Sequence, residues 1–185
     1  MAIPRHWFLL GALLGGVPAL PAQTPDPLSV EVKWTYSTIK NNLVKLAEKM
    51  PAENYSFRPT PEVETFGRRV AHIADANMSV CTGLNGERKT LGAASKTTKA
   101  ELVAALKESF AYCDGVYSSL TDASGTEMID ITQESGRQTR NLRMALLILN
   151  FAHNNEIYGN MVTYMRMKDI VPSSSEPRPQ QQQPR

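Results

Sequence analysis

The chain has 185 residues, and 20 lysines and arginines against 18 acidic residues give it a formal net charge of +2. The length suits a single domain with its own core. Because the charge is nearly balanced and the basic residues are scattered, the sequence lacks the basic patch of a nucleic-acid-binding protein, and we expect no nucleic-acid partner.

The N-terminal segment carries the pattern of a secretory signal peptide. Arg5 precedes the apolar run WFLLGALLGGVPAL, and the small residues and prolines of PAQTPDP follow it. The run is shorter than the about 20 apolar residues that a membrane-spanning helix needs. We therefore expect a signal peptide at residues 1–22, cleaved after Ala22 or Ala19, with an uncleaved anchor as the alternative. Cleavage predicts an exported protein, periplasmic or extracellular, with no membrane contact.

Four amphipathic segments follow, in which apolar residues recur every three or four positions. They cover residues 28–50, 66–84, 98–120 and 139–168. Asp26 and Pro27 predict an N-cap and a first helical turn. Thr98 and Glu101 predict a capping box, in which each side chain satisfies a backbone amide of the other residue.

The four segments predict an all-α protein with a four-helix bundle at residues 26–172. The connection between the third and fourth segments is expected to be an ordered loop with a short extended piece at MIDI. Residues 173–185 are rich in proline and glutamine, with almost nothing apolar to bury, so they predict a disordered tail.

Two histidines remain after signal cleavage, and both lie in helical segments. His153 falls on the apolar stripe of the last segment, so its imidazole is expected to point into the bundle, where bundles build metal sites. A core histidine with one hydrogen-bond partner is the alternative, and it is the more frequent one. His72 lies about 100° around the helix from Ile73, at the edge of the second stripe, which suits a pocket-lining or a half-exposed histidine equally.

Two acids could lie near these histidines, because Asp75 follows His72 and Glu156 follows His153 by three residues. They are candidate oxygen ligands, with a solvated helix flank as the alternative. Cys81 and Cys113 lie on the apolar stripes of the second and third segments. In an exported protein we favour a disulfide between them over two buried thiols.

At this point the residues resemble the DinB-like superfamily, in its branch of exported bacterial proteins. The resemblance rests on FRPTPEVETFG, AHIADAN and HNNEIYGNMVTYMRMKDIVP, in that order, and extends from Val32 to Pro172. It implies a four-helix bundle with a crossover between the second and third helices. Members of this family often dimerise, so a homodimer is a further expectation.

The resemblance also implies a divalent metal ion, commonly zinc or nickel, held by three histidines. The three positions fall on His72, His153 and Ile157. Isoleucine has no lone pair, so the site would be degenerate unless Asp75, Glu156 or an exogenous ligand completed it.

Two functional interpretations stay open. The first is a metal-dependent enzyme acting on a small molecule, a hydrolase or a thiol-dependent transferase, with His72 and His153 as ligands. The second is a non-catalytic bundle that binds a small molecule or a partner protein without metal. Ile157 favours the second interpretation, whereas the two histidines favour the first.

Overall fold

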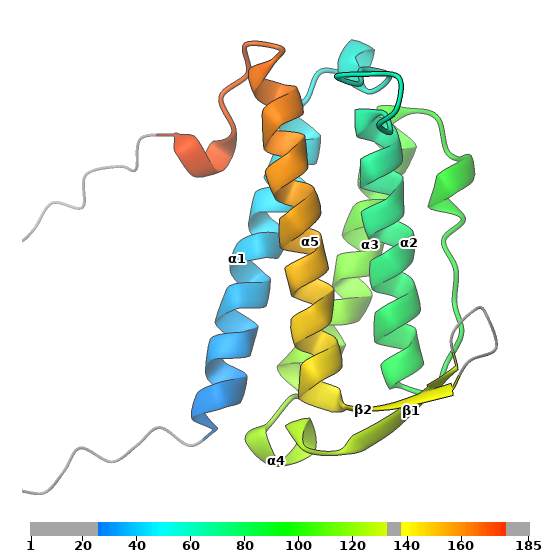
Figure 1. Ribbon diagram of the computed structural model, residues 1–185, viewed down its shortest axis with the longest axis vertical. Helices are drawn as coiled ribbons and strands as arrows, with labels where there is room; N and C mark the ends of the chain where they lie inside the picture. The colour runs from blue at the N-terminus through cyan, green and yellow to red at the C-terminus, as the bar shows by residue number, and fades with distance from the viewer. Residues whose placement is uncertain (1–25, 133–137, 177–185) are drawn as a thin grey trace, which may run out of the picture.

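Four long helices pack side by side as a bundle in the computed structural model, which describes residues 26–132 and 138–176 (Figure 1). They are α1 (Pro27–Lys49), α2 (Phe66–Leu84), α3 (Lys99–Ser118) and α5 (Arg143–Arg166). α1 and α5 run in one direction, and α2 and α3 run in the other (Figure 1). The connection 85–98 therefore runs back along the bundle as a crossover. The expected all-α bundle is confirmed, and so is the crossover between its second and third helices.

Short elements close the two ends of the bundle. At one end lie α4 (Asp122–Gly125) and an antiparallel hairpin of β1 (Met128–Thr132) and β2 (Gln138–Leu142). The described residues also contain three 3-10 turns: η1 (Ala52–Asn54), η2 (Ala93–Ser95) and η3 (Ser173–Ser175). The extended piece at MIDI is confirmed as β1. Its partner β2 was not predicted, and for this reason α5 begins at Arg143 instead of near Thr139.

The start of α1 differs from the prediction, because Asp26 does not cap the helix with its side chain. The carboxylate of Asp122, from α4, accepts hydrogen bonds from the amides of Leu28 (3.3 Å) and Ser29 (2.7 Å) instead. Asp26 accepts in turn from the amide of Asp122 at 2.9 Å. The amides of Leu28 and Ser29 are therefore satisfied by a residue 94 and 93 positions away, which no local motif could indicate. The capping box of Thr98 and Glu101, in contrast, is confirmed.

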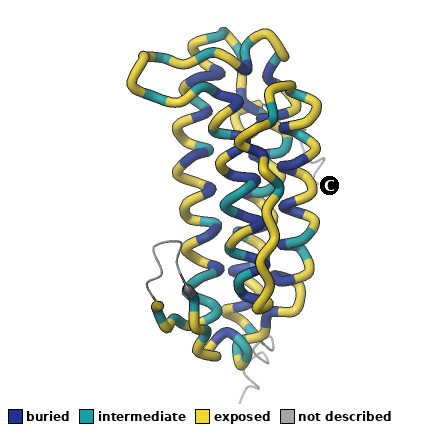
Figure 2. Tube along the Cα trace, turned by 90° about the vertical axis from the view of Figure 1, so that its right-hand side faces the viewer, coloured by how far each residue is buried: buried dark blue, intermediate teal, exposed yellow. Residues whose placement is uncertain are grey.

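The core lies between the four long helices, whose buried positions face inward and whose exposed positions face outward (Figure 2). α2 packs against α3 and α5, and α1 packs against the same two helices. A disulfide joins Cys81 of α2 to Cys113 of α3, with Cα atoms 5.4 Å apart, and both residues are fully buried. The expected disulfide is thus present.

The buried stripe of α5 differs from the predicted one in the first half of the helix. Leu149 is 62% exposed and His153 is also exposed, although both were assigned to the stripe. The residues that α5 buries are Leu147, Asn150, Asn154, Ile157, Met161, Tyr164 and Met165. The error has a physical cause: the start of α5 is apolar on all sides, and two of its buried positions are asparagines, so hydropathy alone points to the wrong face.

The C-terminal end of the domain extends beyond Pro172. η3 packs against α1, and Glu176 forms an ion pair with Lys49 at the end of α1. The start of the predicted disordered tail is therefore structured through residue 176. Residues 177–185 and the predicted signal peptide at 1–22 lie outside the described residues. None of the helices in the described ranges is long and apolar enough to span a membrane.

Candidate metal centre

His72 of α2 and His153 of α5 meet on the outside of the seam between these two helices. Their Nε2 atoms lie 3.0 Å apart, and the ring planes are inclined by 76°. Both residues are exposed, and the side chain of His153 keeps 44% of its surface accessible. The expectation that His153 points into the core is wrong, but the two histidines come together as the resemblance implies.

The separation of the Nε2 atoms suits either a hydrogen bond or a shared metal ion. In the metal-free form one imidazole donates its Nε2–H to the Nε2 lone pair of the other. Metal–imidazole bonds of about 2.1 Å place two ligand nitrogens about 3.0 Å apart at a right angle, and about 3.4 Å apart at a tetrahedral angle. Either coordination geometry therefore needs only a small change in the two side chains.

The electrostatic environment keeps His72 in the form that a metal ion requires. Partial burial lowers the pKa of His72, and the neighbouring His153 and Arg69 lower it further, against the raising effect of Glu64 and Asp75. A neutral imidazole has a free lone pair at neutral pH, so binding of a cation at His72 does not have to displace a proton.

Asp75 has a structural partner and is not available as a ligand. Its carboxylate accepts hydrogen bonds from the backbone amides of Ala93 and Ala94, both at 3.0 Å. These amides belong to η2, in the crossover connection. Asp75 therefore fixes the crossover against α2.

Glu156 lies beside His153, but on the opposite side of the ring from His72. Its Oε2 atom is 4.0 Å from Nδ1 of His153, and its side chain is 75% exposed. At this distance the two groups form no hydrogen bond, and the Glu156 carboxylate lies in solvent beside the ring.

Ile157 occupies the third family position and belongs to the hydrophobic core, with 2% of its surface exposed. No group of three or more histidines, cysteines, aspartates or glutamates that could hold a metal ion is found in the described residues. The donor set therefore fits a metal ion with two protein ligands, whose remaining positions are open to water or to a ligand.

Buried asparagines beneath the histidines form a feature that the sequence did not identify. Asn154, next to His153, donates from Nδ2 to Oδ1 of Asn77 on α2 at 2.8 Å, and both residues are almost fully buried. The pair is only partly satisfied, because Nδ2 of Asn77 and Oδ1 of Asn154 are buried without a hydrogen-bond partner, but its one hydrogen bond still favours one register of the two helices. The amide pair therefore helps to set the height at which His153 meets His72. The position of Asn77 on the apolar stripe of α2 was the available signal.

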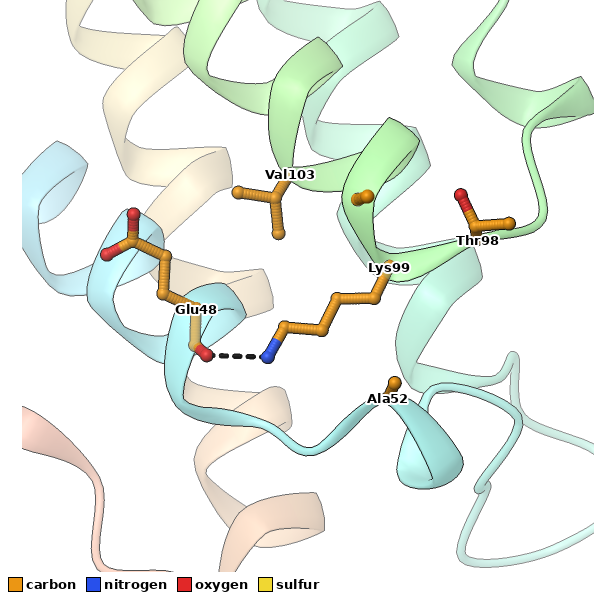
Figure 3. Close-up of a pocket in the computed structure, with 6 residues that line it drawn as sticks. Glu48, Ala52, Thr98, Lys99 and Val103 are labelled. Carbon is orange, nitrogen blue, oxygen red and sulfur yellow. Dashed lines mark hydrogen bonds between the residues drawn. The ribbon is translucent and has the colours of Figure 1, made fainter.

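A cavity of about 500 Å³ lies elsewhere, between the end of α1 and the start of α3 (Figure 3). Its polar groups already have structural partners: Lys99 Nζ donates to the backbone oxygen of Glu48 at 2.7 Å, and Thr98 belongs to the capping box. The remaining lining comes from Ala52, Ala100 and Val103. Because the histidines lie on the α2–α5 seam, this cavity on the α1–α3 seam is not part of their site.

Comparisons with known proteins agree with this architecture. A family model described as the DinB superfamily matches residues 35–155, more than half of the chain. A search of curated proteins finds no match.

Three solved structures illustrate the likeness of the fold. A DinB-like protein from Bacillus cereus ATCC 10987 matches with a TM-score of 0.61 and 22% identity, covering 78% of this chain and 93% of that one. A DinB-like protein from Bacillus subtilis matches with a TM-score of 0.60 and 19% identity, covering 76% and 94%. A mycothiol-dependent maleylpyruvate isomerase matches with a TM-score of 0.56 and 12% identity, covering 74% of this chain and 60% of the isomerase. At these identities the likeness shows the fold alone.

Proposed function

We propose that this chain, which belongs to the DinB superfamily, is an exported protein that holds a divalent metal ion, zinc or nickel, between His72 and His153. The observation that carries the proposal is the 3.0 Å separation of the two Nε2 atoms, which come from helices 81 residues apart in sequence. Structural histidines rarely direct two ring nitrogens at one solvent-open point.

Each residue near the pair has a distinct role in this proposal. His72 supplies a neutral imidazole from α2, and His153 supplies the second ligand nitrogen from α5. Ile157 fills the core beneath the pair and excludes water from that side. A metal ion in such an open site would supply Lewis acidity and lower the pKa of a bound water.

The candidate reactions are metal-dependent hydrolysis and thiol-dependent transfer on a small molecule. The second class is suggested by the mycothiol-dependent isomerase of similar fold. Both cysteines of this chain are joined in the disulfide. A thiol for such a transfer would therefore come from a cosubstrate and not from the protein.

The second candidate function is a binding bundle without metal, for a small molecule or a partner protein, and the burial of Ile157 at the third family position favours it.

Both candidate functions place the protein in the same proposed compartment, outside the cytoplasm. A buried disulfide supports export, because disulfides persist in oxidising compartments. A homodimer, which the family resemblance implies, is part of the same proposal.

Equilibrium dialysis of the chain from residue 23 to 185 against nickel, without an affinity tag, tests the metal site. We expect one nickel ion per chain at saturation, and at least a tenfold weaker affinity for His153→Ala, because a chelate of two imidazoles becomes a single ligand. Asn155→Ala, an exposed neighbour on α5, is the matched control and should bind as the wild type does. Equal nickel uptake by His153→Ala would reject the proposed site, and no uptake by the wild type would leave the metal-free binding bundle as the account.

A further inference from the structure

Arg69 is a partly buried arginine of α2. Its Nε atom is buried and has no hydrogen-bond partner. None of the ion pairs formed within the described ranges 26–132 and 138–176 includes Arg69. A buried donor without a partner costs free energy, and native proteins seldom retain one without a reason.

The nearby acids do not supply this missing partner. Glu64 forms its ion pair with Arg68, with Oε1 and Nε 4.0 Å apart. The Asp75 carboxylate is occupied by the two amides of η2. Within the described residues the guanidinium of Arg69 therefore has no anionic partner.

Arg69 is also close to the histidine pair. It precedes His72 by three residues on α2, and residues at this spacing are neighbours on one helix face, about 5–6 Å apart between Cβ atoms. The lowering effect of Arg69 on the pKa of His72 agrees with this proximity. One small molecule can therefore contact the guanidinium and the imidazoles together.

We propose that Arg69 binds the oxyanion group, a carboxylate or a phosphate, of a small ligand whose adjacent atoms reach His72 and His153. This inference rests on the proposed function, because the same ligand would contact Arg69 and the metal ion that His72 and His153 are proposed to hold. A guanidinium forms two parallel, charge-assisted hydrogen bonds to such a group. Arg69 is thus the residue that determines specificity for anionic ligands.

Nickel titrations in the presence and absence of inorganic phosphate test this assignment on the chain from 23 to 185. We expect phosphate to tighten nickel binding about tenfold in the wild type, a typical coupling between adjacent sites. Arg69→Gln should lose this coupling, and its nickel affinity in the absence of phosphate should not fall, because the substitution removes a positive charge near the metal site. Arg68→Gln, which removes the same charge from the neighbouring position, should retain the coupling. Repeating the titration with acetate distinguishes a carboxylate site from a phosphate site.

A second measurement keeps the inference separate from the metal proposal. Phosphate added to the metal-free protein at pH 6 should shift the imidazole NMR signals of the wild type but not those of Arg69→Gln. If no variant binds nickel but this difference remains, the metal proposal fails and the anion site stands. Equal phosphate effects in the wild type and Arg69→Gln, or no phosphate effect in either measurement, would overturn the anion site.

Discussion

His153 and Ile157 lie one helical turn apart on α5, yet one is exposed and the other is buried. Positions i and i+4 differ by about 40° around a helix. This rotation is enough, at the edge of the α2–α5 seam, to place the imidazole on the rim and the isoleucine in the core. A third protein ligand at position 157 would have to approach from the core side of the histidine pair.

Ile157→His should raise nickel affinity at least tenfold, because it restores a third imidazole one turn from His153. The same change should lower the free energy of unfolding by about 1–3 kcal/mol, since a polar ring replaces a core side chain. Nickel titration and urea unfolding measure the two effects. Ile157→Asn, which is polar but has no imidazole, is the control. It should show the stability loss without the gain in affinity, and an equal gain in both variants would contradict the account.

Part of the site could be predicted at the level of single residues, through family resemblance more than through periodicity. The resemblance identified His72, His153 and the replaced position at Ile157. Periodicity placed His153 in the core, because the buried face of α5 contains asparagines. Arg69 could not be singled out, since its lack of a partner depends on where Glu64 and Asp75 direct their carboxylates.

At the scale of secondary structure, the predicted helices correspond to the observed ones because caps and prolines lie at their ends. Thr98 and Glu101 begin α3 as expected, and Pro51 follows the end of α1. The strand β2 was missed because its polar sequence acquires its conformation by pairing with β1. The long-range cap of α1 by Asp122 likewise depends on tertiary structure.

Asp122→Ala should lower the free energy of unfolding by about 1–2 kcal/mol, because the amides of Leu28 and Ser29 lose their acceptor. Urea unfolding followed by circular dichroism measures the change. Asp130→Ala removes an exposed acid of the hairpin, whose ion pair with Arg140 has little stabilising value, and serves as the control. Equal stabilities of the two variants would mean that α1 has another cap.

Across the whole molecule, buried tyrosines connect the helices through their hydroxyl groups. Tyr36 and Tyr117 stack with ring centroids 3.6 Å apart, and Tyr117 donates to the backbone oxygen of Leu147 at 2.8 Å. Burial raises the pKa of Tyr36, which the Asp114 carboxylate raises further. Burial also raises the pKa of Tyr55 and of Tyr117. These phenols are held in the protonated form by the fold.

Stability should therefore fall as the pH rises above about 10, the ordinary pKa of tyrosine. The folded-state pKa values are raised, so the stabilisation is fully present below pH 10. It is lost above that value because the unfolded chain ionises first. Urea unfolding midpoints at pH 8, 9, 10 and 11 measure the effect. In Tyr117→Phe the midpoint should fall less steeply with pH than in the wild type. Midpoints that stay constant up to pH 11 would show that these hydroxyls are not buried.

The most direct test of the metal site is nitrogen NMR of the imidazoles during addition of zinc. The chain from 23 to 185 has two histidines, His72 and His153. The NMR signals of each ring can therefore be assigned with one variant that lacks the other histidine. We predict that the Nε2 signals of both histidines shift together and saturate at one zinc ion per chain, and that each zinc-bound ring carries its proton on Nδ1. A shift at one histidine alone, or no shift at either, would contradict the claim that the pair forms a metal site.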